Sequence, residues 1–259
     1  MKLVGKTALV TGAASERSIG WGIARELALE GADVAVNDIA PSEALDARAE
    51  ELAAMGRRSL AVSADVTRPE RVEAMFAEVV QALGHIDIVV SNAGIIRWQH
   101  FLDITPEELR AVVNVNIMGT VNVCRAAATH MIRQGNGGRI IINSSVQSDV
   151  QFPITPVYGA TKKAMHTLVG ALALELAPHR INVTHIAPGW VRSPLNDISP
   201  ELQTPEGVEA QRRVIPLRRD GHIDEMGRAV VYLASSDGDY VTGSSIRLDG
   251  GLAISKYSL

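Results

Sequence analysis

Residues 7–31 have the sequence TALVTGAASERSIGWGIARELALEG, which combines three kinds of segment. Thr7 to Thr11 is a short apolar run, typical of a buried strand. Ile19 to Glu30 has the apolar spacing of a helix, and Gly31 after it is a common helix terminator. A loop rich in small residues joins the two. This stretch therefore predicts a strand, a loop and a helix, the repeating unit of α/β proteins with parallel sheets.

The same alternation continues along the whole chain. Further apolar runs predict strands at 33–37, 59–63, 86–91, 139–143, 181–186 and 245–248. Helical patterns separate them at 42–55, from a cap at Thr67 to about 83, from Thr105 to about 133, and around 157–176. With right-handed crossovers, these elements predict a doubly wound Rossmann-type sheet of about seven parallel strands with helices on both faces. We expect one domain over residues 1–259, with the long irregular stretch at 193–218 forming a substrate lid.

Composition narrows the function classes. Of 259 residues, 46% are hydrophobic and 21% are charged, which is ordinary for a globular protein that buries a large core. A net charge of −4 without a long basic run disfavours nucleic-acid binding. Cys124 is the single cysteine, which excludes an intramolecular disulfide and a cysteine-rich metal site. The start of the chain lacks a signal-peptide pattern, and no run approaches the ~18 apolar residues of a membrane span, so we expect a cytoplasmic protein.

Small and polar residues follow the first four predicted strands, whose carboxyl ends a parallel sheet brings to one edge. The small residues of the loop from Gly12 to Gly20 let its backbone approach a pyrophosphate at the N-terminus of the first helix. Asp38 follows the second strand, where a carboxylate can accept hydrogen bonds from an adenosine ribose and would repel a 2′-phosphate. Asp65-Val66 and Asn92-Ala93-Gly94 follow the next two strands. The pattern predicts a dinucleotide site that favours NAD.

A second group of residues indicates acid–base chemistry. In Tyr158-Gly-Ala-Thr-Lys162 a phenol and an ammonium are four residues apart, so on a helix they share one face. A phenol has an ordinary pKa of ~10, and we expect the nearby positive charge to lower the pKa of Tyr158. Ser145 follows the strand at 139–143 and could reach the same pocket. Two hydroxyls that polarise a carbonyl require no metal, so we expect no metal site.

Taken together, the order and spacing of these motifs resemble the short-chain dehydrogenase/reductase family in its one-domain form, from about Lys6 to Gly251. The matching residues are Thr11-Gly12 with Gly20, Asp65, Asn92-Ala93-Gly94, Asn116, Ser145, Tyr158, Lys162, Pro188-Gly189-Trp190-Val191, Thr242-Gly243 and Asp249-Gly250-Gly251.

The resemblance implies an oxidoreductase that transfers a hydride reversibly between NAD(H) and a secondary alcohol or ketone. Tyr158 would be the acid–base catalyst, Ser145 would orient the carbonyl, Lys162 would bind the nicotinamide ribose, and Asn116 would hold a water in a proton relay. The residues expected to bind the cofactor are Gly12, Ser18, Ile19, Gly20, Asp38, Asp65, Val66, Asn92, Ala93, Gly94, Tyr158, Lys162, Pro188, Gly189, Val191 and Ser193. Similar proteins form homodimers or homotetramers, pairing through the helices that carry Asn116 and Tyr158 and through the C-terminal strand.

The glycine loop departs from the usual pattern of this family. Two residues are inserted, and Ser18 stands where a middle glycine is expected. The loop is similar to that of the enoyl reductase branch, but enzymes of that branch space their tyrosine and lysine more widely, so we keep the alcohol and ketone interpretation. The insertion leaves the pyrophosphate contacts open, and Arg17 within it could weaken the preference for NAD, so NADP is possible.

The sequence indicates a class of substrate but not its identity. Candidate pocket residues, placed by their proximity to the motifs, are Ile96, Trp98, Gln147, Gln151, Phe152, Trp190 and Leu195. Gln147 and Gln151 among apolar neighbours favour a sugar, a polyol or another polar hydroxy compound. Two alternatives are an NADPH-dependent 3-oxoacyl carrier or ketone reductase and a non-catalytic dinucleotide-binding scaffold.

Overall fold

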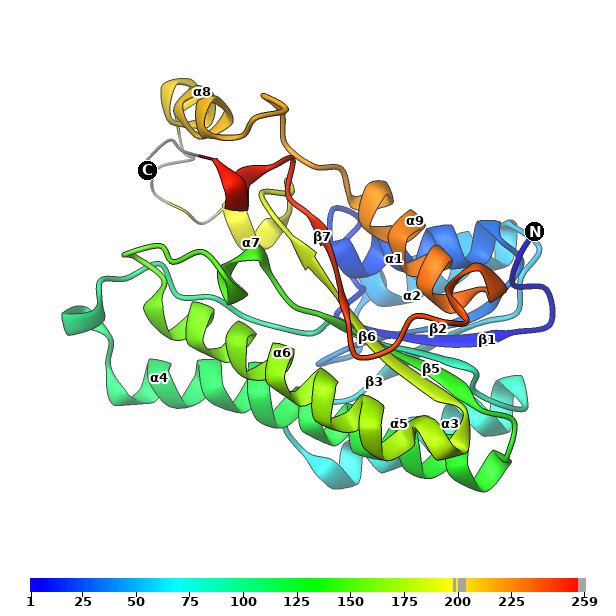
Figure 1. Cartoon of the computed structure of the whole chain (residues 1–259). Helices are drawn as coiled ribbons and strands as arrows, with labels where there is room; N and C mark the ends of the chain where they lie inside the picture. Colours follow the sequence, from blue (N-terminus) through cyan, green and yellow to red (C-terminus); the bar gives the residue numbers. More distant parts are fainter. Residues whose placement is uncertain (198, 200–203, 256–259) are drawn as a thin grey trace.

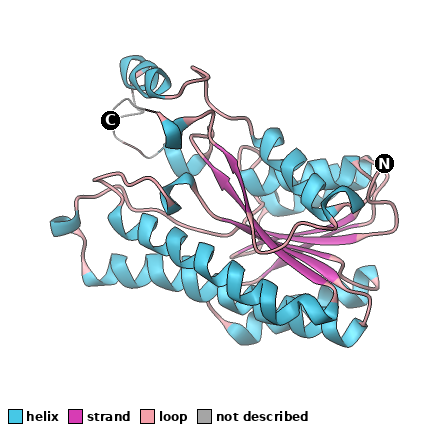
Figure 2. Ribbon diagram, in the orientation of Figure 1, coloured by secondary structure: helices cyan, strands magenta, loops and turns pink. Residues whose placement is uncertain are grey.

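The structure, a computed structural model, describes residues 1–197, 199 and 204–255. Within them a sheet of seven strands runs in the order β3-β2-β1-β4-β5-β6-β7 (Figures 1 and 2), and every neighbouring pair is parallel. The strands are β1 (Thr7–Thr11), β2 (Asp33–Asp38), β3 (Ser59–Ser63), β4 (Ile88–Ser91), β5 (Gly138–Asn143), β6 (Ile181–Pro188) and β7 (Ser245–Leu248). The expected doubly wound α/β fold is confirmed.

Helices cover both faces of the sheet. They are α1 (Ile19–Leu29), α2 (Glu43–Ala54), α3 (Pro69–Leu83), α4 (Pro106–Val113), α5 (Thr120–Gln134), α6 (Pro156–Leu176), α7 (Pro194–Asp197), α8 (Pro205–Val214) and α9 (Ile223–Ala234). Helices α1, α2 and α9 lie on one face, and α3, α5 and α6 lie on the other (Figure 1). The sheet order reverses between β1 and β4, which opens a crevice beyond their carboxyl ends, where doubly wound proteins bind ligands.

The central strands are apolar on both sides because each side is covered by helices. Leu9 and Ile140 pack with α3, α5 and α6, whereas Val10 and Ile141, one position further along each strand, pack with α1 and α9. All four side chains are fully buried. This double burial explains why these strands are visible in the sequence as continuous apolar runs.

Two helical regions differ from the sequence expectation. Residues 193–218 were expected to be irregular, but α7 and α8 lie within them. The signal for α8 is Thr204 followed by Pro205, because the Thr204 hydroxyl caps the helix and proline suits its first position. Helix α9 was not predicted at all, although His222 and Glu225 form a capping box at its start. Residues 198 and 200–203 of the expected lid lie outside the described residues.

The start of one predicted helix and the continuity of another also differ from the sequence expectation. Thr67 does not cap α3, because its hydroxyl donates to Asp65 and the helix begins after Arg68 with Pro69 at its first position. The helix expected from Thr105 to about Arg133 is interrupted by a π-helical segment, η2 (Asn114–Gly119), between α4 and α5. Single π-helical turns inside helices are rare and frequently lie at functional sites.

We expect Cys124 to be inert in the folded protein. Its side chain is 2% exposed on α5, and burial raises the pKa of the thiol to about 12, so almost no reactive thiolate forms near neutrality. Iodoacetamide labelling followed by mass spectrometry should give no adduct in buffer and one adduct in denaturant. The Cys124→Ser variant should give none in either, and rapid labelling of the folded protein would contradict this packing.

Candidate functional site

Most of the expected cofactor and catalytic residues line one cavity at the carboxyl ends of the strands. It has a volume of about 340 Å³ and runs from Asp38 and Asp65 at one end to Tyr158 and Lys162 at the other. Its lining also contains these expected cofactor residues: Gly12, Ser18, Ile19, Val66, Asn92, Ala93, Gly94, Pro188, Gly189, Val191 and Ser193. Gly20, Asn116 and Gln151 are not among the lining residues.

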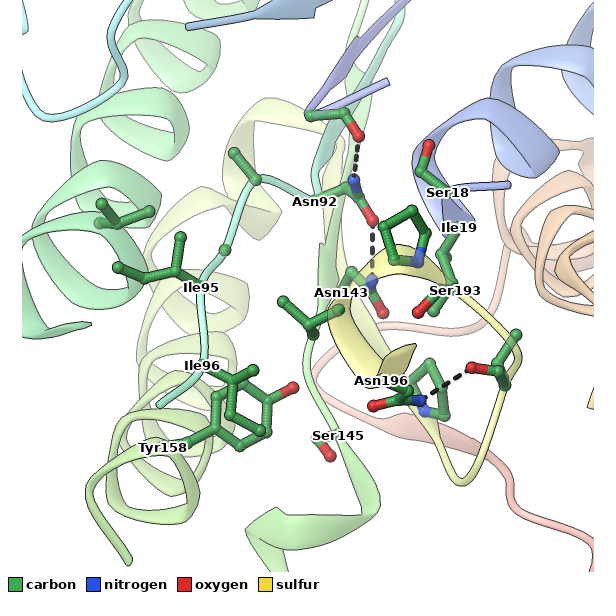
Figure 3. A pocket seen from close by; sticks show the side chains of 18 of the residues that line it. Ser18, Ile19, Asn92, Ile95, Ile96, Asn143, Ser145, Tyr158, Ser193 and Asn196 are labelled. Carbon is green, nitrogen blue, oxygen red and sulfur yellow. Dashed lines mark hydrogen bonds between the residues drawn. The ribbon is translucent and has the colours of Figure 1, made fainter. Parts of the chain in front are cut away.

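Asn92 connects three strands at this edge. Its side-chain nitrogen donates to the carbonyl oxygens of Thr11 (2.7 Å), the last residue of β1, and Gly12 (3.0 Å), the residue after it. Its side-chain oxygen accepts from Nδ2 of Asn143, the last residue of β5, at 2.7 Å (Figure 3). The Thr11 hydroxyl in turn accepts from the backbone N–H groups of Asn92 and Ala93. These bonds fix the floor of the cavity where the strand order reverses.

The glycines of the first loop allow close approach of backbone to backbone. Gly12 has a φ of +68°, a left-handed conformation that favours glycine, and a side chain there would come within 2.9 Å of the Ala93 Cα. A side chain at Gly20 would collide with the carbonyl oxygen of Gly12. Gly20 therefore packs α1 against the loop instead of lining the cavity.

Ser18 begins α1 in place of a glycine. Its hydroxyl accepts from the backbone N–H of Trp21 at 3.0 Å, which caps the helix. Arg17, one residue earlier, is paired with Asp197 of α7 at 2.7 Å. Both side chains are exposed, so the pair contributes about 0–1 kcal/mol to stability. The pair nevertheless directs the Arg17 charge toward α7, which limits its expected effect on cofactor choice.

Asp38 keeps free acceptor capacity at the end of β2. One carboxylate oxygen accepts from the Ala14 N–H at 3.1 Å and the other accepts from the Ile39 N–H at 2.9 Å. A carboxylate has about four lone-pair sites, so two remain for hydroxyl donors. Asp65, after β3, uses one oxygen on the N–H and hydroxyl of Thr67. Both side chains are thus held by local bonds at one end of the cavity.

Tyr158, Ser145 and Lys162 meet at the other end of the cavity. Tyr158 and Ser145 line it from the first turn of α6 and from the loop after β5 (Figure 3). The Ser145 oxygen accepts from the backbone N–H of Gln147 at 3.1 Å, so its own proton is available for another acceptor. Lys162 lies one turn after Tyr158, and its Nζ is 5.4 Å from the centroid of the phenol ring. The predicted proximity of these three side chains is confirmed.

The expected direction of the Tyr158 pKa is wrong for this structure. Burial raises the pKa of Tyr158 to about 12, and the hydrogen bond with Ser145 only partly opposes that effect. Burial also lowers the pKa of Lys162 to about 8. The spacing in the sequence indicated the attraction between phenolate and ammonium, but it could not show that both groups are removed from water. Desolvation disfavours the charged form of each.

Lys162 is held by the end of β5. Its Nζ donates to the carbonyl oxygen of Asn143 at 2.8 Å, and its own carbonyl accepts from the Ser144 hydroxyl at 3.2 Å. An ammonium has three donors, so two are left for ligand groups. Asn143 was not assigned a role from sequence, although it is the last residue of a predicted strand that ends at the same edge of the sheet as Asn92. Its Oδ1 is buried without a hydrogen-bond partner within the described part of the chain.

Asn116 stands behind the cavity wall, in the π-helical segment η2. It is fully buried, its side-chain oxygen accepts from the Ile95 N–H at 2.8 Å, and its nitrogen donates to the Ile95 carbonyl at 2.9 Å and to the Thr161 hydroxyl at 3.1 Å. The Thr161 hydroxyl donates to the carbonyl of Tyr158 at 2.7 Å. Asn116 thus positions the loop after β4 and the first turn of α6, and its expected water relay stays a prediction.

The remaining part of the cavity, beside Tyr158 and Ser145, has an aromatic wall. Trp98 and Trp190 stack with ring centroids 5.8 Å apart and an angle of 16° between their planes. Phe152 lies against Trp190 at 6.1 Å. Trp98 Nε1 also donates to the carbonyl oxygen of Leu195 in α7, at 3.3 Å. Of the substrate residues expected from sequence, Ile96, Trp98, Gln147, Phe152, Trp190 and Leu195 line the cavity.

The donor and acceptor set fits a nicotinamide dinucleotide. Carboxylate acceptors stand at one end of the cavity, the capped start of α1 lies beside a glycine loop in the middle, and a lysine with unused donors stands at the other end. The buried Oδ1 of Asn143, which lacks a partner among the described residues, adds an acceptor beside that lysine. Within residues 1–197, 199 and 204–255 no group of three or more metal-ligating side chains occurs, and no helix is long and apolar enough to cross a membrane.

The chain is similar to known proteins over almost its whole length. Residues 12–253 match a family model described as enoyl-(acyl carrier protein) reductase. L-rhamnose 1-dehydrogenase (NAD(P)(+)) of a Sphingomonas strain is 35% identical over 255 residues, covering 98% of this chain and 99% of that protein. The 2-dehydro-3-deoxy-D-gluconate 5-dehydrogenase of Escherichia coli is 37% identical and covers 96% of each chain. A gluconate 5-dehydrogenase from Burkholderia cenocepacia, solved with NADP and tartrate, superposes with a TM-score of 0.91 at 33% identity, covering 98% of this chain and 97% of that chain.

We expect Asn92→Asp to weaken both the fold and the site. The substitution replaces a donor with a carboxylate oxygen beside the carbonyl oxygens of Thr11 and Gly12, and leaves these two partly buried acceptors without the donor. The free energy of unfolding, measured in urea without cofactor, should fall by about 2–4 kcal/mol. Asn136→Asp makes the same change on an exposed loop and should have little effect. Equal stability of both variants would contradict the role of Asn92.

Proposed function

Because the chain belongs to the short-chain dehydrogenase/reductase family, and is therefore an oxidoreductase of that type, we propose that it transfers a hydride reversibly between NAD(H) and a secondary alcohol or ketone. The observation that carries this proposal is the convergence of Ser145, Tyr158 and Lys162 at one end of a cavity whose other end holds Asp38. A sugar, a polyol or another polar hydroxy compound is the proposed substrate. The proteins named above include dehydrogenases of L-rhamnose and of gluconate.

The chain's own residues can move the proton that accompanies hydride transfer. With a pKa near 12, Tyr158 is a phenol at neutral pH and can donate its proton to a carbonyl oxygen during reduction. Ser145 can donate a second hydrogen bond to the same oxygen, since the bond that its oxygen accepts from the Gln147 N–H does not use its proton. In the oxidation direction Tyr158 must first lose its proton.

The cofactor, when bound, supplies the hydride donor or acceptor and, in its oxidised form, a positive charge. Such a charge close to Tyr158 favours the phenolate, which is the form that oxidation requires. Lys162 Nζ adds a second positive charge at the same end of the cavity, and its two unused donors can hold ribose hydroxyls. We infer that cofactor binding, more than Lys162 alone, brings Tyr158 into its active protonation state.

The preference for NAD rests on Asp38. Its remaining lone pairs suit the two ribose hydroxyls, and its negative charge opposes a 2′-phosphate. Arg17, the nearby cation that could favour the phosphate, is paired with Asp197. An NADPH-dependent 3-oxoacyl carrier or ketone reductase is the alternative that the same catalytic residues would allow.

We also propose that the chain acts as one domain, and that residues 193–218 form its substrate lid. Ser193, Pro194, Leu195 and Asn196 line the cavity, which supports that role. Pairing into a homodimer or homotetramer stays a prediction of the family resemblance. It is supported by exposed apolar side chains on the predicted contact helices, such as Ile132 on α5 and Leu174 on α6. The cytoplasmic location stays a prediction from sequence.

Tyr158→Phe should remove the proton donor and leave the cavity intact. We expect turnover to fall by about 10²–10⁴-fold, the usual contribution of a positioned acid or base. NADH binding, followed by its fluorescence, should change less than about threefold, because the phenol ring and Lys162 are retained. Tyr240→Phe, at a fully exposed position, is the matched control. Near-normal turnover of Tyr158→Phe would refute the assignment.

Asp38→Ser should reduce the discrimination between cofactors. We expect the wild-type kcat/KM to be higher with NAD⁺ than with NADP⁺, and the ratio to fall at least about tenfold when the negative charge is removed. Asp46→Ser removes the same charge from an exposed position on α2 and should leave the ratio unchanged. A wild-type enzyme that prefers NADP⁺ would contradict the role given to Asp38.

A further inference from the structure

Gln147 presents a side-chain amide to the substrate end of the cavity. It lies two residues after Ser145, is 6% exposed and belongs to the cavity lining. Its side-chain oxygen accepts from the hydroxyl of Thr155 at 2.7 Å. Because the oxygen is held by Thr155, the amide NH₂ is the end left to face a ligand. The bond is fully buried, so it fixes the amide firmly.

Thr155 makes this bond where a helix cap would be expected. It is the N-cap residue of α6, the position at which a threonine hydroxyl usually accepts from a backbone N–H of the first turn. Ser18, Ser42, Thr105 and Thr204 all make such a bond at the starts of their helices. Thr155 makes no side-chain cap bond, and its hydroxyl goes to Gln147 instead. A local rule broken beside catalytic residues indicates a functional requirement.

The surfaces around this amide suit a ring that carries hydroxyl groups. The stacked indoles of Trp98 and Trp190, with Phe152 tilted against Trp190, form an aromatic wall of the cavity. An aromatic face attracts the partly positive hydrogens of C–H bonds, and a few polar groups in an apolar pocket fix the orientation of a ligand. The wall and the oriented amide thus offer one surface for the C–H face of a ring and one donor for an oxygen at its edge.

The charges of the cavity argue against an acidic substrate. Among the described lining residues, the charged side chains are Asp38, Asp65 and Lys162. The two carboxylates stand at the far end, and Lys162 is engaged with Asn143 behind Tyr158. A substrate carboxylate beside the indoles would lose its hydration without gaining a cation from this part of the wall, which is costly.

We propose that Gln147 is a specificity-determining residue that donates to an oxygen of an uncharged, polyhydroxylated ring substrate, and that Thr155 is the residue that positions its amide. This inference rests on the proposed function of the same site. Within that function, we expect the enzyme to prefer neutral sugars and cyclic polyols over sugar acids and over alcohols that lack further hydroxyl groups.

The test is a set of NAD⁺-linked oxidation assays with three kinds of substrate. Neutral aldopyranoses and inositols represent the proposed class, the matching aldonates represent sugar acids, and cyclohexanol reports the hydride transfer alone. We expect the best neutral substrate to exceed the best aldonate in kcat/KM by at least about tenfold. Cyclohexanol should be oxidised slowly.

The variants test how selectivity arises. Gln147→Leu should lower the ratio of sugar to cyclohexanol kcat/KM by about 10–100-fold, as expected for loss of a buried hydrogen bond to the substrate. Thr155→Val should lower the same ratio, mainly through KM, and Thr155→Ser should restore it because it keeps the donor. Gln151→Leu is the matched control, because Gln151 is exposed and outside the cavity lining. A purely structural role for Gln147 or Thr155 would change thermal stability and leave the substrate ratio unaltered.

The outcomes separate this inference from the proposed function. If aldonates are preferred, if only cyclohexanol is oxidised, or if Gln147→Leu lowers all rates equally, the specificity proposal is wrong while the dehydrogenase proposal stands. If no alcohol of any kind is oxidised although NADH binds, the proposed function itself fails.

Discussion

The amide of Asn92 is the interaction on which the site depends. It lies at the point where the strand order reverses, and its hydrogen bonds join the ends of β1, β4 and β5. On one side, the Asn92 amide anchors the loop that begins at Gly12. On the other side it holds Asn143, whose carbonyl oxygen in turn receives the ammonium of Lys162. The cofactor end and the catalytic end of the cavity are therefore parts of one hydrogen-bonded unit.

Burial gives the catalytic end its chemical character. Tyr158 and Lys162 are both removed from water, and their pKa values move to about 12 and about 8, because each neutral form is favoured. With a pKa near 12, Tyr158 is a neutral phenol near neutrality, which is not the form that oxidises an alcohol, whereas Lys162, with a pKa near 8, keeps most of its positive charge. Burial thus holds Tyr158 in the protonated form that reduction requires. Charge brought in with the oxidised cofactor shifts the balance in the other direction.

Much of the fold could be predicted because the sheet is buried on both faces. Continuous apolar runs such as Ile140-Ile141-Ile142 are typical of strands covered by helices on both sides, and the residue types after each strand indicated where the cavity lies. Lys162 was placed by helical spacing alone. The sequence could not show which of several nearby partners a side-chain hydroxyl bonds in the folded protein. Thr67 looked like a helix cap but bonds Asp65, and Thr155 occupies a cap position but bonds Gln147. Helices α8 and α9 carried usable capping signals at Thr204 and His222 that were missed.

The π-helical segment η2 has a consequence for how this chain can change over evolutionary time. A π turn contains one residue more than an α turn, so deleting a single residue between Asn114 and Gly119 would give a regular, intrinsically more favourable helix. Such a deletion would also remove the wider turn in which Asn116 lies. Asn116 could then no longer reach both Ile95 and Thr161. Natural length variation should therefore be rare in this segment, even though a shorter one would make the better isolated helix.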